Sequence, residues 1–447
     1  MSDQQPPVII IFGITGDLSK RKLLPALYHL FEKQLLPNGT KIIGTSRREL
    51  SRSDLLNTIE ESIQAKKESC RPEAMNQLNE AVSTAQVDPV KTADFDKLKD
   101  LLDTLDSDGP RNRLFYMSIP PSAYGQIISN LQSSGLNAQQ NRIMLEKPFG
   151  YNFNSAEASV KLVSSAFNEE QIYRIDHYLA KETAQNLLSF RLHNPIFVPL
   201  WNNQHIESVH VRQFETLGIE GRVNFYEQTG ALRDMIQSHL MQLLALTLMD
   251  VPEDMTSRSI HEAKQRFFKG LDIANPALAT RGQYQSYRQE VSNPNSIVET
   301  YVKLELSSHL QPWQGVKLFL EHGKGMNQNI ADIAVAFKSA GERRRNSLIF
   351  QIQPNEGISL DLLVKEPGLA NEMRHTSLDL KYKDVFTDIL KIDAYERVLM
   401  DAIRGDQSLF AADEEVLTTW RVLDPLLDAW SGTNDGLVFY PNGASTV

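Results

Sequence analysis

The sequence predicts two domains of mixed class: an α/β domain with a doubly wound parallel sheet, followed by an α+β domain with a large antiparallel sheet and helices. Two observations predict this. In the first part of the chain, short apolar runs alternate with helical stretches, which is typical of a parallel sheet covered on both faces. After about residue 200, apolar and polar residues alternate one by one, which indicates antiparallel strands with unlike faces. We therefore expect a Rossmann-like domain over residues 1–178 and a second domain over residues 179–447.

Each N-terminal strand is predicted from a short run of β-branched, aromatic or other apolar residues. The runs span residues 8–12, 41–46, 113–119, 142–147 and 171–175. Leucines recur at helical spacing from Leu23 onward, so a helix follows the first run. We expect mostly polar helical segments over residues 53–105 and a helix opened by prolines over residues 120–131.

The C-terminal strands are predicted from alternation of apolar and polar side chains. It is clearest over residues 298–306, 333–337 and 358–364. A single helix is expected over residues 227–250, between sheet segments, and helices return over residues 393–430.

Charge and composition exclude several classes of protein. The 447 residues carry a net charge of −10 at pH 7, so a global basic footprint for nucleic acid is absent. The chain has one cysteine, Cys70, and therefore no internal disulfide. It shows no signal-peptide pattern and no run of about 18 apolar residues. We expect a cytoplasmic protein that binds neither nucleic acid nor membrane.

A glycine turn joins the first strand to the first helix, in the segment GITGDLS at residues 13–19. Gly13 allows a tight turn, and Gly16 permits close approach of a diphosphate to the helix N-terminus. Thr15 can add a hydroxyl donor, and Ser19 stands where the third glycine of the usual dinucleotide pattern would be. The alternative is a compact turn that binds no ligand.

The end of the second strand favours NADP over NAD. An NAD site would place an acidic residue there to hold the ribose hydroxyls. Here the segment reads Ser46, Arg47 and Arg48, and guanidinium groups suit a 2′-phosphate. The alternative is a solvated pair of charges.

Three segments together resemble the glucose-6-phosphate dehydrogenase family: GITGDLSKRKLLPAL at residues 13–27, EKPFG at 146–150 and RIDHYLAKE at 174–182. The resemblance continues in order through segments at residues 214–222, 233–244, 282–287, 352–360 and 393–410. It implies that residues 1–178 bind the dinucleotide and that residues 179–447 bind substrate and dimerise.

The activity that this resemblance implies is oxidation of the C1 hydroxyl of glucose 6-phosphate to 6-phosphogluconolactone, with hydride transfer to NADP and without a metal. This is the first step of the oxidative pentose phosphate pathway. The resemblance also implies a homodimer or homotetramer that associates through the antiparallel sheet.

The phosphate site is expected in the segment 176–181. A helix that begins near Asp176 would place His177 and Lys181, four residues apart, on one face. By resemblance, His177, Tyr178 and Lys181 hold the sugar phosphate. From spacing alone, an exposed pair without a ligand is equally open.

The proton acceptor is expected to be a histidine, because its pKa lies near working pH. By resemblance His239 takes the hydroxyl proton, and Asp176 orients its ring. The alternative is a core histidine on an apolar helix. Asp234 and Glu215 would accept hydrogen bonds from sugar hydroxyls, and their alternative is ordinary surface charge.

The remaining roles also follow from the resemblance. Lys147 would lie between cofactor and substrate, next to a peptide bond to Pro148 that is cis in the family. Lys22 is similar to another lysine near the family's active site. The expected cofactor-binding residues are Gly13, Thr15, Gly16, Asp17, Leu18, Arg47 and Lys147.

The chain departs from the family near the substrate phosphate. The segment 321–329 keeps Lys324, but Glu321 and Asn329 stand where cations are usual. The segment 342–346 could supply a cation or be a solvated turn. Ser238 replaces an asparagine. These departures leave two alternatives open: the same chemistry on another sugar or sugar phosphate, or a catalytically idle, NADP-binding regulatory paralogue.

Overall fold

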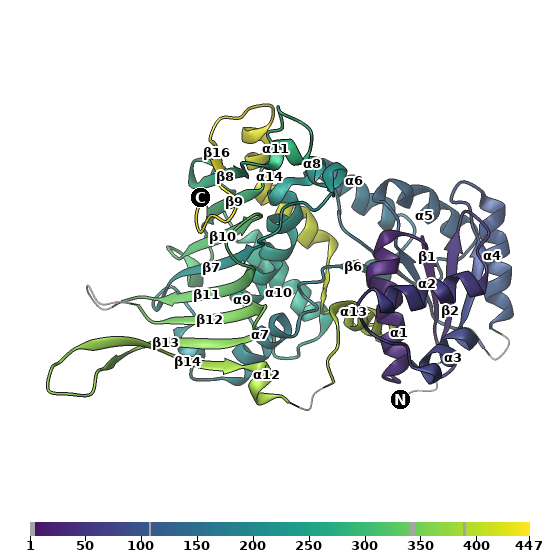
Figure 1. The fold of residues 1–447 in the computed structure, drawn as a ribbon, viewed down its shortest axis with the longest axis horizontal. Helices are drawn as coiled ribbons and strands as arrows, with labels where there is room; N and C mark the ends of the chain where they lie inside the picture. Colours follow the sequence, from purple (N-terminus) through teal and green to yellow (C-terminus); the bar gives the residue numbers. More distant parts are fainter. Residues whose placement is uncertain (1–4, 107–108, 340–344, 388–389) are drawn as a thin grey trace. The chain divides into compact units, whose positions relative to one another are not determined.

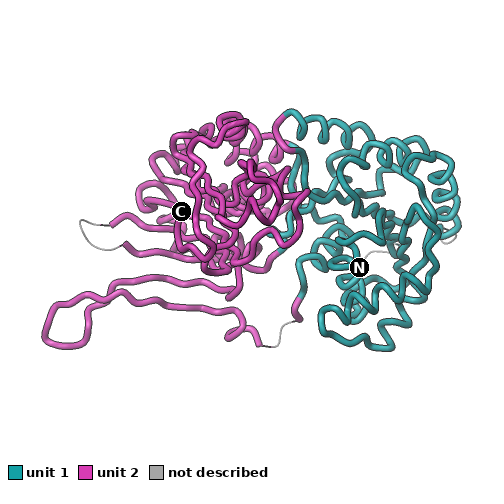
Figure 2. Tube along the Cα trace, turned by 45° about the horizontal axis from the view of Figure 1, so that its top comes forward, with its two compact units in different colours: residues 1–150, 154–180, 392–413 teal, residues 151–153, 181–391, 414–447 magenta. Residues whose placement is uncertain are grey.

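The computed structural model describes residues 5–106, 109–339, 345–387 and 390–447, and the chain forms two compact units (Figures 1 and 2). Unit 1 contains residues 1–150, 154–180 and 392–413, and unit 2 contains residues 151–153, 181–391 and 414–447. The predicted domain ranges, 1–178 and 179–447, differ from these units chiefly in the segment 392–413, which returns to unit 1.

Unit 1 contains a seven-stranded sheet in the order β15-β6-β5-β4-β1-β2-β3. All neighbours pair in parallel except β15, which is antiparallel to β6. The strands are β1 (Val8–Phe12), β2 (Lys41–Ser46), β3 (Val82–Gln86), β4 (Arg113–Met117), β5 (Arg142–Leu145), β6 (Ile172–Ile175) and β15 (Phe410–Ala411).

Helices cover both faces of this sheet (Figure 1). Alternate residues of β1 enter different hydrophobic clusters: Ile9 and Ile11 face α1, α2, α3 and α13, whereas Ile10 and Phe12 face α4, α5 and α6. The doubly wound arrangement is therefore confirmed. The helices are α1 (Leu24–Glu32), α2 (Arg52–Gln64), α3 (Pro72–Ala81), α4 (Thr92–Thr104), α5 (Tyr124–Ser133), α6 (Phe153–Ser164) and α13 (Ala394–Arg404).

Two expectations about unit 1 were wrong. The polar stretch 53–105 contains the strand β3 in addition to helices. This edge strand was missed because only Val82 is buried, while its other residues are half-buried or exposed. The stretch 393–430 is interrupted by β15 between α13 and α14 (Asp413–Trp430). The strand β3 lacks the apolar run that marks the inner strands, and β15 is only two residues long.

Unit 2 contains a nine-stranded sheet in the order β14-β13-β12-β11-β7-β10-β9-β8-β16. Its strands are mostly antiparallel, as predicted, but β7 pairs with β10 in parallel, as β8 does with β16. The strands are β7 (Ile206–Phe214), β8 (Ala279–Tyr284), β9 (Tyr301–Leu306), β10 (Lys317–Gly323), β11 (Ile330–Phe337), β12 (Ser347–Gln353), β13 (Gly357–Lys365), β14 (Met373–Lys381) and β16 (Leu437–Tyr440).

The helix predicted over residues 227–250 is three segments. They are α8 (Val223–Ala231), the π-helical η5 (Leu232–Leu240) and α9 (Met241–Leu248). The break lies at Gly230, where φ is +62° and a Cβ atom would lie 2.4 Å from the carboxylate of Glu299. That carboxylate accepts a hydrogen bond from the amide of Leu232 at 3.0 Å and so caps the start of η5. The other helices are α7 (Glu182–His193), α10 (Ser257–Lys269), α11 (Tyr287–Glu290) and α12 (Tyr382–Val385).

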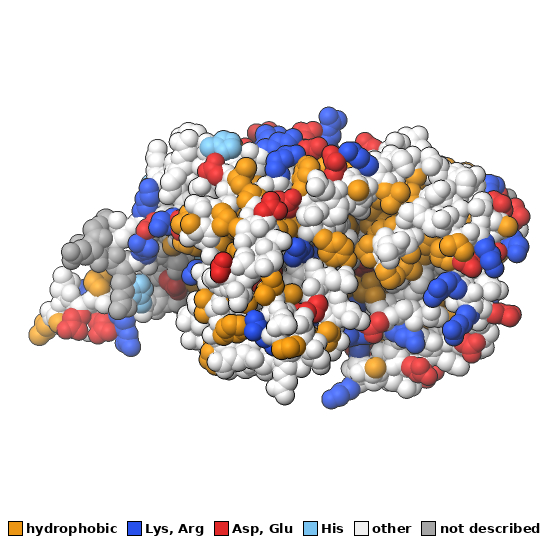
Figure 3. Space-filling view, turned by 90° about the horizontal axis from the view of Figure 1, so that it is seen from above, with side chains coloured by type: hydrophobic (Ala, Val, Ile, Leu, Met, Phe, Trp, Pro, Cys, Tyr) orange, Lys and Arg blue, Asp and Glu red, His pale blue; other side chains and the backbone are white. Residues whose placement is uncertain are grey.

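The surface carries mixed charge. On the face drawn in Figure 3, lysine and arginine side chains are interspersed with aspartate and glutamate side chains. Among the residues that the structure describes, no helix is both long and apolar enough to cross a membrane.

Candidate active site

The glycine turn in unit 1 is packed tightly against the end of β4. Gly13 has a φ of +82°, and a Cβ atom there would lie 2.3 Å from the carbonyl oxygen of Ser118, so glycine is required. The buried hydroxyl of Ser19 lies 3.0 Å from the carbonyl oxygen of Gly13 and 2.8 Å from the hydroxyl of Ser118. Ser19 thus holds the turn at the position where a third glycine would allow close packing.

Three other predicted cofactor residues are part of this turn, and Arg47 lies on the neighbouring strand connection. Thr15 and Asp17 are exposed, while Leu18 packs against the core. Arg47 directly follows β2, the parallel neighbour of β1, so it lies at the same edge of the sheet as the turn. Its side chain is exposed and forms no ion pair with a described residue. The carboxyl end of these two strands therefore offers both the backbone of the glycine turn and the guanidinium of Arg47.

Lys147 follows β5, and its peptide bond to Pro148 is cis. Two tyrosine hydroxyls form hydrogen bonds with the preceding residue, Glu146. The hydroxyl of Tyr116 donates to its carboxylate at 2.5 Å, and the hydroxyl of Tyr124 donates to its carbonyl at 3.1 Å and accepts from its amide at 3.2 Å. Burial raises the pKa of Glu146 to about 7 and outweighs the hydrogen bond from Tyr116 and the charge of Lys147.

Asp176 begins a turn and not the predicted helix. Its carboxylate accepts a hydrogen bond from the amide of Tyr178 at 3.0 Å, and its carbonyl accepts from the amide of Leu179 at 3.1 Å. Such local bonds compete with a helix. The first helical residue of α7 is Glu182, and Lys181 caps it with extended backbone. The argument that His177 and Lys181 share a helix face is therefore wrong.

The residues of this turn belong to different units. Asp176, His177 and Tyr178 lie in unit 1, and Lys181 lies in unit 2. The rings of His177 and Tyr178 are 5.1 Å apart. Within unit 2, the ammonium of Lys181 donates to the side-chain oxygen of Gln353, at the end of β12. Their predicted joint role in phosphate binding stays a prediction.

Glu215 and Lys324 meet because β7 and β10 are parallel neighbours. Phe214 pairs with Gly323 at the carboxyl ends of these strands, so the residues that follow emerge side by side. The ammonium of Lys324 forms an ion pair with the carboxylate of Glu215. Burial alone would raise the pKa of Glu215, but the positive charge of Lys324 reverses this, and the pKa is lowered. The carboxylate is therefore ionised and accepts hydrogen bonds.

Asp234 and His239 lie about one turn apart on η5, which contacts β7, β9 and β10. Asp234 is half-buried, and its charge raises the pKa values of Glu215 and His322. His239 is 1 % exposed, which either a base or a core histidine would be. Its pairing with Asp176, which belongs to unit 1, stays a prediction.

The departures from the family have local explanations. Glu321 is buried and accepts from the hydroxyl of Tyr301 at 2.6 Å, with His210 at 2.7 Å. Asn329 accepts from the amide of Thr216 at 2.8 Å. Of the segment 342–346, residues 342–344 lie outside the described residues, and Arg345 pairs with Glu207 at 2.6 Å.

Sequence reasoning missed two side chains of this cluster. Gln213 and His322 pair across β7 and β10 and adjoin Glu215 and Lys324. His322 lies within the segment 321–329 that the sequence singles out. Its place could have been found from alternation, since successive residues of a strand face opposite sides and Glu321 faces His210.

Comparison with known proteins decides the family. The model of the glucose-6-phosphate dehydrogenase NAD binding domain matches residues 10–186, and that of the C-terminal domain matches residues 188–446. The glucose-6-phosphate 1-dehydrogenase of Chlamydia muridarum is 37% identical, over 95% of this chain and 90% of the relative. That of Mycolicibacterium smegmatis is 35% identical, over 99% and 94%.

The solved structures agree. A glucose-6-phosphate dehydrogenase in complex with its substrate glucose-6-phosphate is 31% identical, with a TM-score of 0.94 over 100% of this chain and 97% of that chain. The chain belongs to the glucose-6-phosphate dehydrogenase family. The predictions of the family, of an oxidoreductase and of a nicotinamide cofactor are thereby confirmed.

Proposed function

We propose that this glucose-6-phosphate dehydrogenase family member oxidises the C1 hydroxyl of glucose 6-phosphate to 6-phosphogluconolactone and transfers the hydride to NADP. The observation that carries the proposal is the likeness, over the whole chain, to a dehydrogenase that holds this substrate. Except for Lys22, which lies on the helical segment Ser19–Leu23, every predicted site residue stands in one of the two units at the carboxyl end of a strand, in an adjoining turn or on η5.

The proton is handled by residues of both units. His239 accepts the proton of the C1 hydroxyl as the hydride leaves C1, and Asp176 orients the ring and stabilises the imidazolium. NADP, bound at the glycine turn, supplies the hydride acceptor. Glu215 and Asp234 accept hydrogen bonds from the sugar hydroxyls.

The phosphate is held by His177, Tyr178 and Lys181, with Lys324 as a further cation and Lys147 beside the cofactor. Arg47 takes the 2′-phosphate of NADP, which its exposure and its place after β2 support. We further propose a cytoplasmic homodimer or homotetramer that associates through the large sheet.

A spectrophotometric assay tests the activity. Reduction of NADP with glucose 6-phosphate, compared with glucose, other sugar phosphates and NAD, separates the proposal from its alternatives. Turnover with another sugar and not with glucose 6-phosphate favours the alternative of a changed substrate. The observation behind that alternative is that Asn329 stands where the family usually has a cation. Binding of NADP without turnover on any of these sugars favours an idle paralogue.

His239→Asn tests the proton acceptor. We expect kcat to fall about 10²- to 10⁴-fold, because an amide cannot take the proton, while KM for glucose 6-phosphate changes little. A variant with unchanged kcat contradicts the role of His239.

Lys181→Ala tests the phosphate anchor. Loss of one charge-assisted bond should raise KM for glucose 6-phosphate about 10- to 100-fold. Activity with unphosphorylated glucose should be unaffected, since glucose carries no anion. An equal loss with both sugars argues against the anchor.

A further inference from the structure

Two buried side chains of unit 2, Gln213 and His322, adjoin the proposed substrate site but have no part in the roles proposed so far. Gln213 lies on β7 and His322 on β10, and both are at most 1 % exposed. The two residues are partners in the parallel register of these strands. Gln213 and Glu215 are two residues apart, so their side chains point to the same face of the sheet. A buried amide and a buried imidazole therefore stand next to the carboxylate of Glu215.

A chain of hydrogen bonds fixes the orientation of the Gln213 side chain. Nδ1 of His322 lies 3.1 Å from the main-chain oxygen of Gln213, which can only accept, so Nδ1 carries the hydrogen. The same N–H group faces the side-chain oxygen of Gln213. The amide nitrogen of Gln213 is thereby turned towards Glu215 and donates to its Oε1 at 3.2 Å.

His322 acts in this chain as a neutral ring. Burial, and next the charge of Lys324, lower the pKa of His322 to about 4. At neutral pH the ring therefore has a single N–H group, and the two oxygens of Gln213 require it at Nδ1. The orientation of the Gln213 amide is thus the same throughout the neutral pH range.

Both carboxylate oxygens of Glu215 are held in this arrangement. Gln213 donates to Oε1, and the ammonium of Lys324 forms an ion pair with Oε2. Each oxygen can accept a further hydrogen bond, and the side chain of Glu215 is 31 % exposed, so lone pairs remain within reach of a ligand. A glutamate side chain loses rotamer freedom when it binds a ligand. Two donors on its two oxygens fix the carboxylate plane beforehand and reduce that cost.

We propose that Gln213 and His322 are positioning residues for the substrate: His322 orients the amide of Gln213, and Gln213 orients the carboxylate of Glu215 towards a hydroxyl group of the sugar ring. The inference rests on the proposed function, in which Glu215 accepts hydrogen bonds from sugar hydroxyls. Neither residue touches the substrate, and both act through Glu215. Binding of the sugar ring, as distinct from binding of its phosphate, thus depends on hydrogen bonds between two neighbouring strands of unit 2.

Gln213→Met tests the link to Glu215, because methionine keeps the length of the side chain and removes the donor. We expect KM for glucose 6-phosphate to rise about 10-fold, with kcat and KM for NADP nearly unchanged. The matched control is Gln283→Met. Gln283 is also a buried glutamine of the large sheet, and its amide donates to the main-chain oxygens of Ser296 and Val298 at 3.2 and 2.9 Å. This control should lose stability and keep its KM. An unchanged KM in Gln213→Met, or an equal rise in Gln283→Met, overturns the assignment.

A double-mutant cycle shows whether Gln213 acts through Glu215. The effect of Gln213→Met is measured in the wild-type protein and again in a Glu215→Gln background. In the second background the rise in KM should shrink to less than about 2-fold, because no carboxylate is left to orient. Additive effects of the two substitutions contradict the inference.

Two substitutions of His322 separate positioning from packing. Phenylalanine keeps a ring but lacks the N–H group, whereas asparagine is smaller but carries an amide N–H group close to the place of Nδ1. We expect KM for glucose 6-phosphate to rise about 10-fold in His322→Phe and less than about 3-fold in His322→Asn. The smaller side chain should nevertheless destabilise the protein more, since it leaves a cavity. A merely structural role for His322 would reverse the order of the two KM values.

The tautomer of His322 can be measured without a substrate. In full-length protein labelled with ¹⁵N-histidine, the ring of His322, assigned with His322→Asn, should show a protonated Nδ1 and an unprotonated Nε2 at pH 7. A ring protonated at Nε2 overturns this inference and leaves the proposed function intact. Absence of turnover with glucose 6-phosphate overturns the proposed function instead.

Discussion

Two buried carboxyl groups, one in each unit, show opposite acidities, and the more deeply buried one is the stronger acid. Glu146 in unit 1 is only partly buried, yet its pKa is raised to about 7. Glu415 in unit 2 is 0 % exposed, yet its pKa is lowered to about 2. Burial favours the neutral form of both groups, so depth does not explain the difference.

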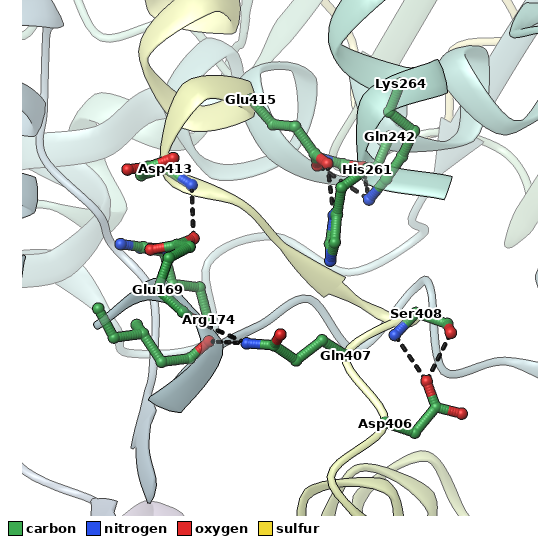
Figure 4. A network of polar contacts seen from close by, with 11 residues as sticks. Glu169, Arg174, Gln242, His261, Lys264, Asp406, Gln407, Ser408, Asp413 and Glu415 are labelled. Atoms are coloured by element: carbon green, nitrogen blue, oxygen red, sulfur yellow. Dashed lines mark hydrogen bonds and ion pairs between the residues drawn. The ribbon is translucent and has the colours of Figure 1, made fainter. Parts of the chain in front are cut away.

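The partners explain it. Glu415, on α14, lies 2.9 Å from the ammonium of Lys264 and 2.8 Å from Nδ1 of His261, and accepts from the amide of Gln242 at 2.9 Å (Figure 4). Burial raises the pKa of Glu415, but the charges of Lys264 and His261 together lower it by more than burial raises it. For Glu146, burial and the like charge of Asp176 raise the pKa by more than the hydrogen bond from Tyr116 and the charge of Lys147 lower it. A buried carboxyl is thus ionised where its partners lower the pKa by more than burial raises it, and tends to the neutral form where they do not.

Removing the cation from Glu415 should have the largest effect. Lys264→Met leaves a wholly buried carboxylate without its ammonium, and the free energy of unfolding should fall by about 3–5 kcal/mol at pH 8. The loss should shrink at lower pH, as the carboxyl takes up a proton. Urea unfolding of the full chain measures both.

The same helix offers a control for that change. Lys269 pairs with Glu414 at 3.5 Å, and both side chains are about half exposed. Lys269→Met should cost less than about 1 kcal/mol. Equal losses in the two variants mean that burial of the Lys264–Glu415 pair does not matter.

The pH dependence of stability should come next in size. The folded-state pKa of Glu146 is above its ordinary value, so its contribution to stability is fully present below about pH 4.5 and is lost as pH rises through 7. Glu146→Gln removes this loss. The unfolding free energy of the variant should rise relative to wild type by roughly 1–3 kcal/mol between pH 5 and pH 8, after allowance for screening.

Glu157 on α6 is the matched control, since its side chain is 42 % exposed and pairs with Lys161 one turn away. Glu157→Gln should show no such trend between pH 5 and pH 8. A pH trend of the same size in both variants means that the environment of Glu146 is not its cause.

Local sequence predicted the strands that carry a short run of β-branched residues. The run 8–12 became β1 and the run 41–46 became β2, each with the predicted bounds. The glycine turn was predictable because its geometry depends on neighbours in the chain. The false helix at Asp176 shows the limit of this reasoning, since one side chain that bonds its own backbone outweighed the helical spacing.

Contacts between distant strands could not be predicted. Glu215 and Lys324 are 109 residues apart, and they meet only because β7 and β10 are parallel neighbours. The same register places Gln213 against His322. Period-two alternation predicts which face a residue takes, but not which strand lies beside it. The candidate site residues of unit 2 could therefore be named from the family resemblance, but which of them lie side by side became known only from the order of the strands in the sheet.

The smallest expected effect separates the two tyrosines that hold Glu146. Tyr116 donates to the carboxylate, so Tyr116→Phe should cost about 1 kcal/mol more at pH 8 than at pH 5, because an ionised acceptor forms the stronger hydrogen bond. Tyr124 bonds only the main chain of Glu146 within the described contacts, so Tyr124→Phe should cost the same at both pH values. Urea unfolding at the two pH values measures each cost. A pH-dependent cost in Tyr124→Phe and not in Tyr116→Phe would contradict the view that the hydroxyl of Tyr116 favours the ionised form of this carboxyl.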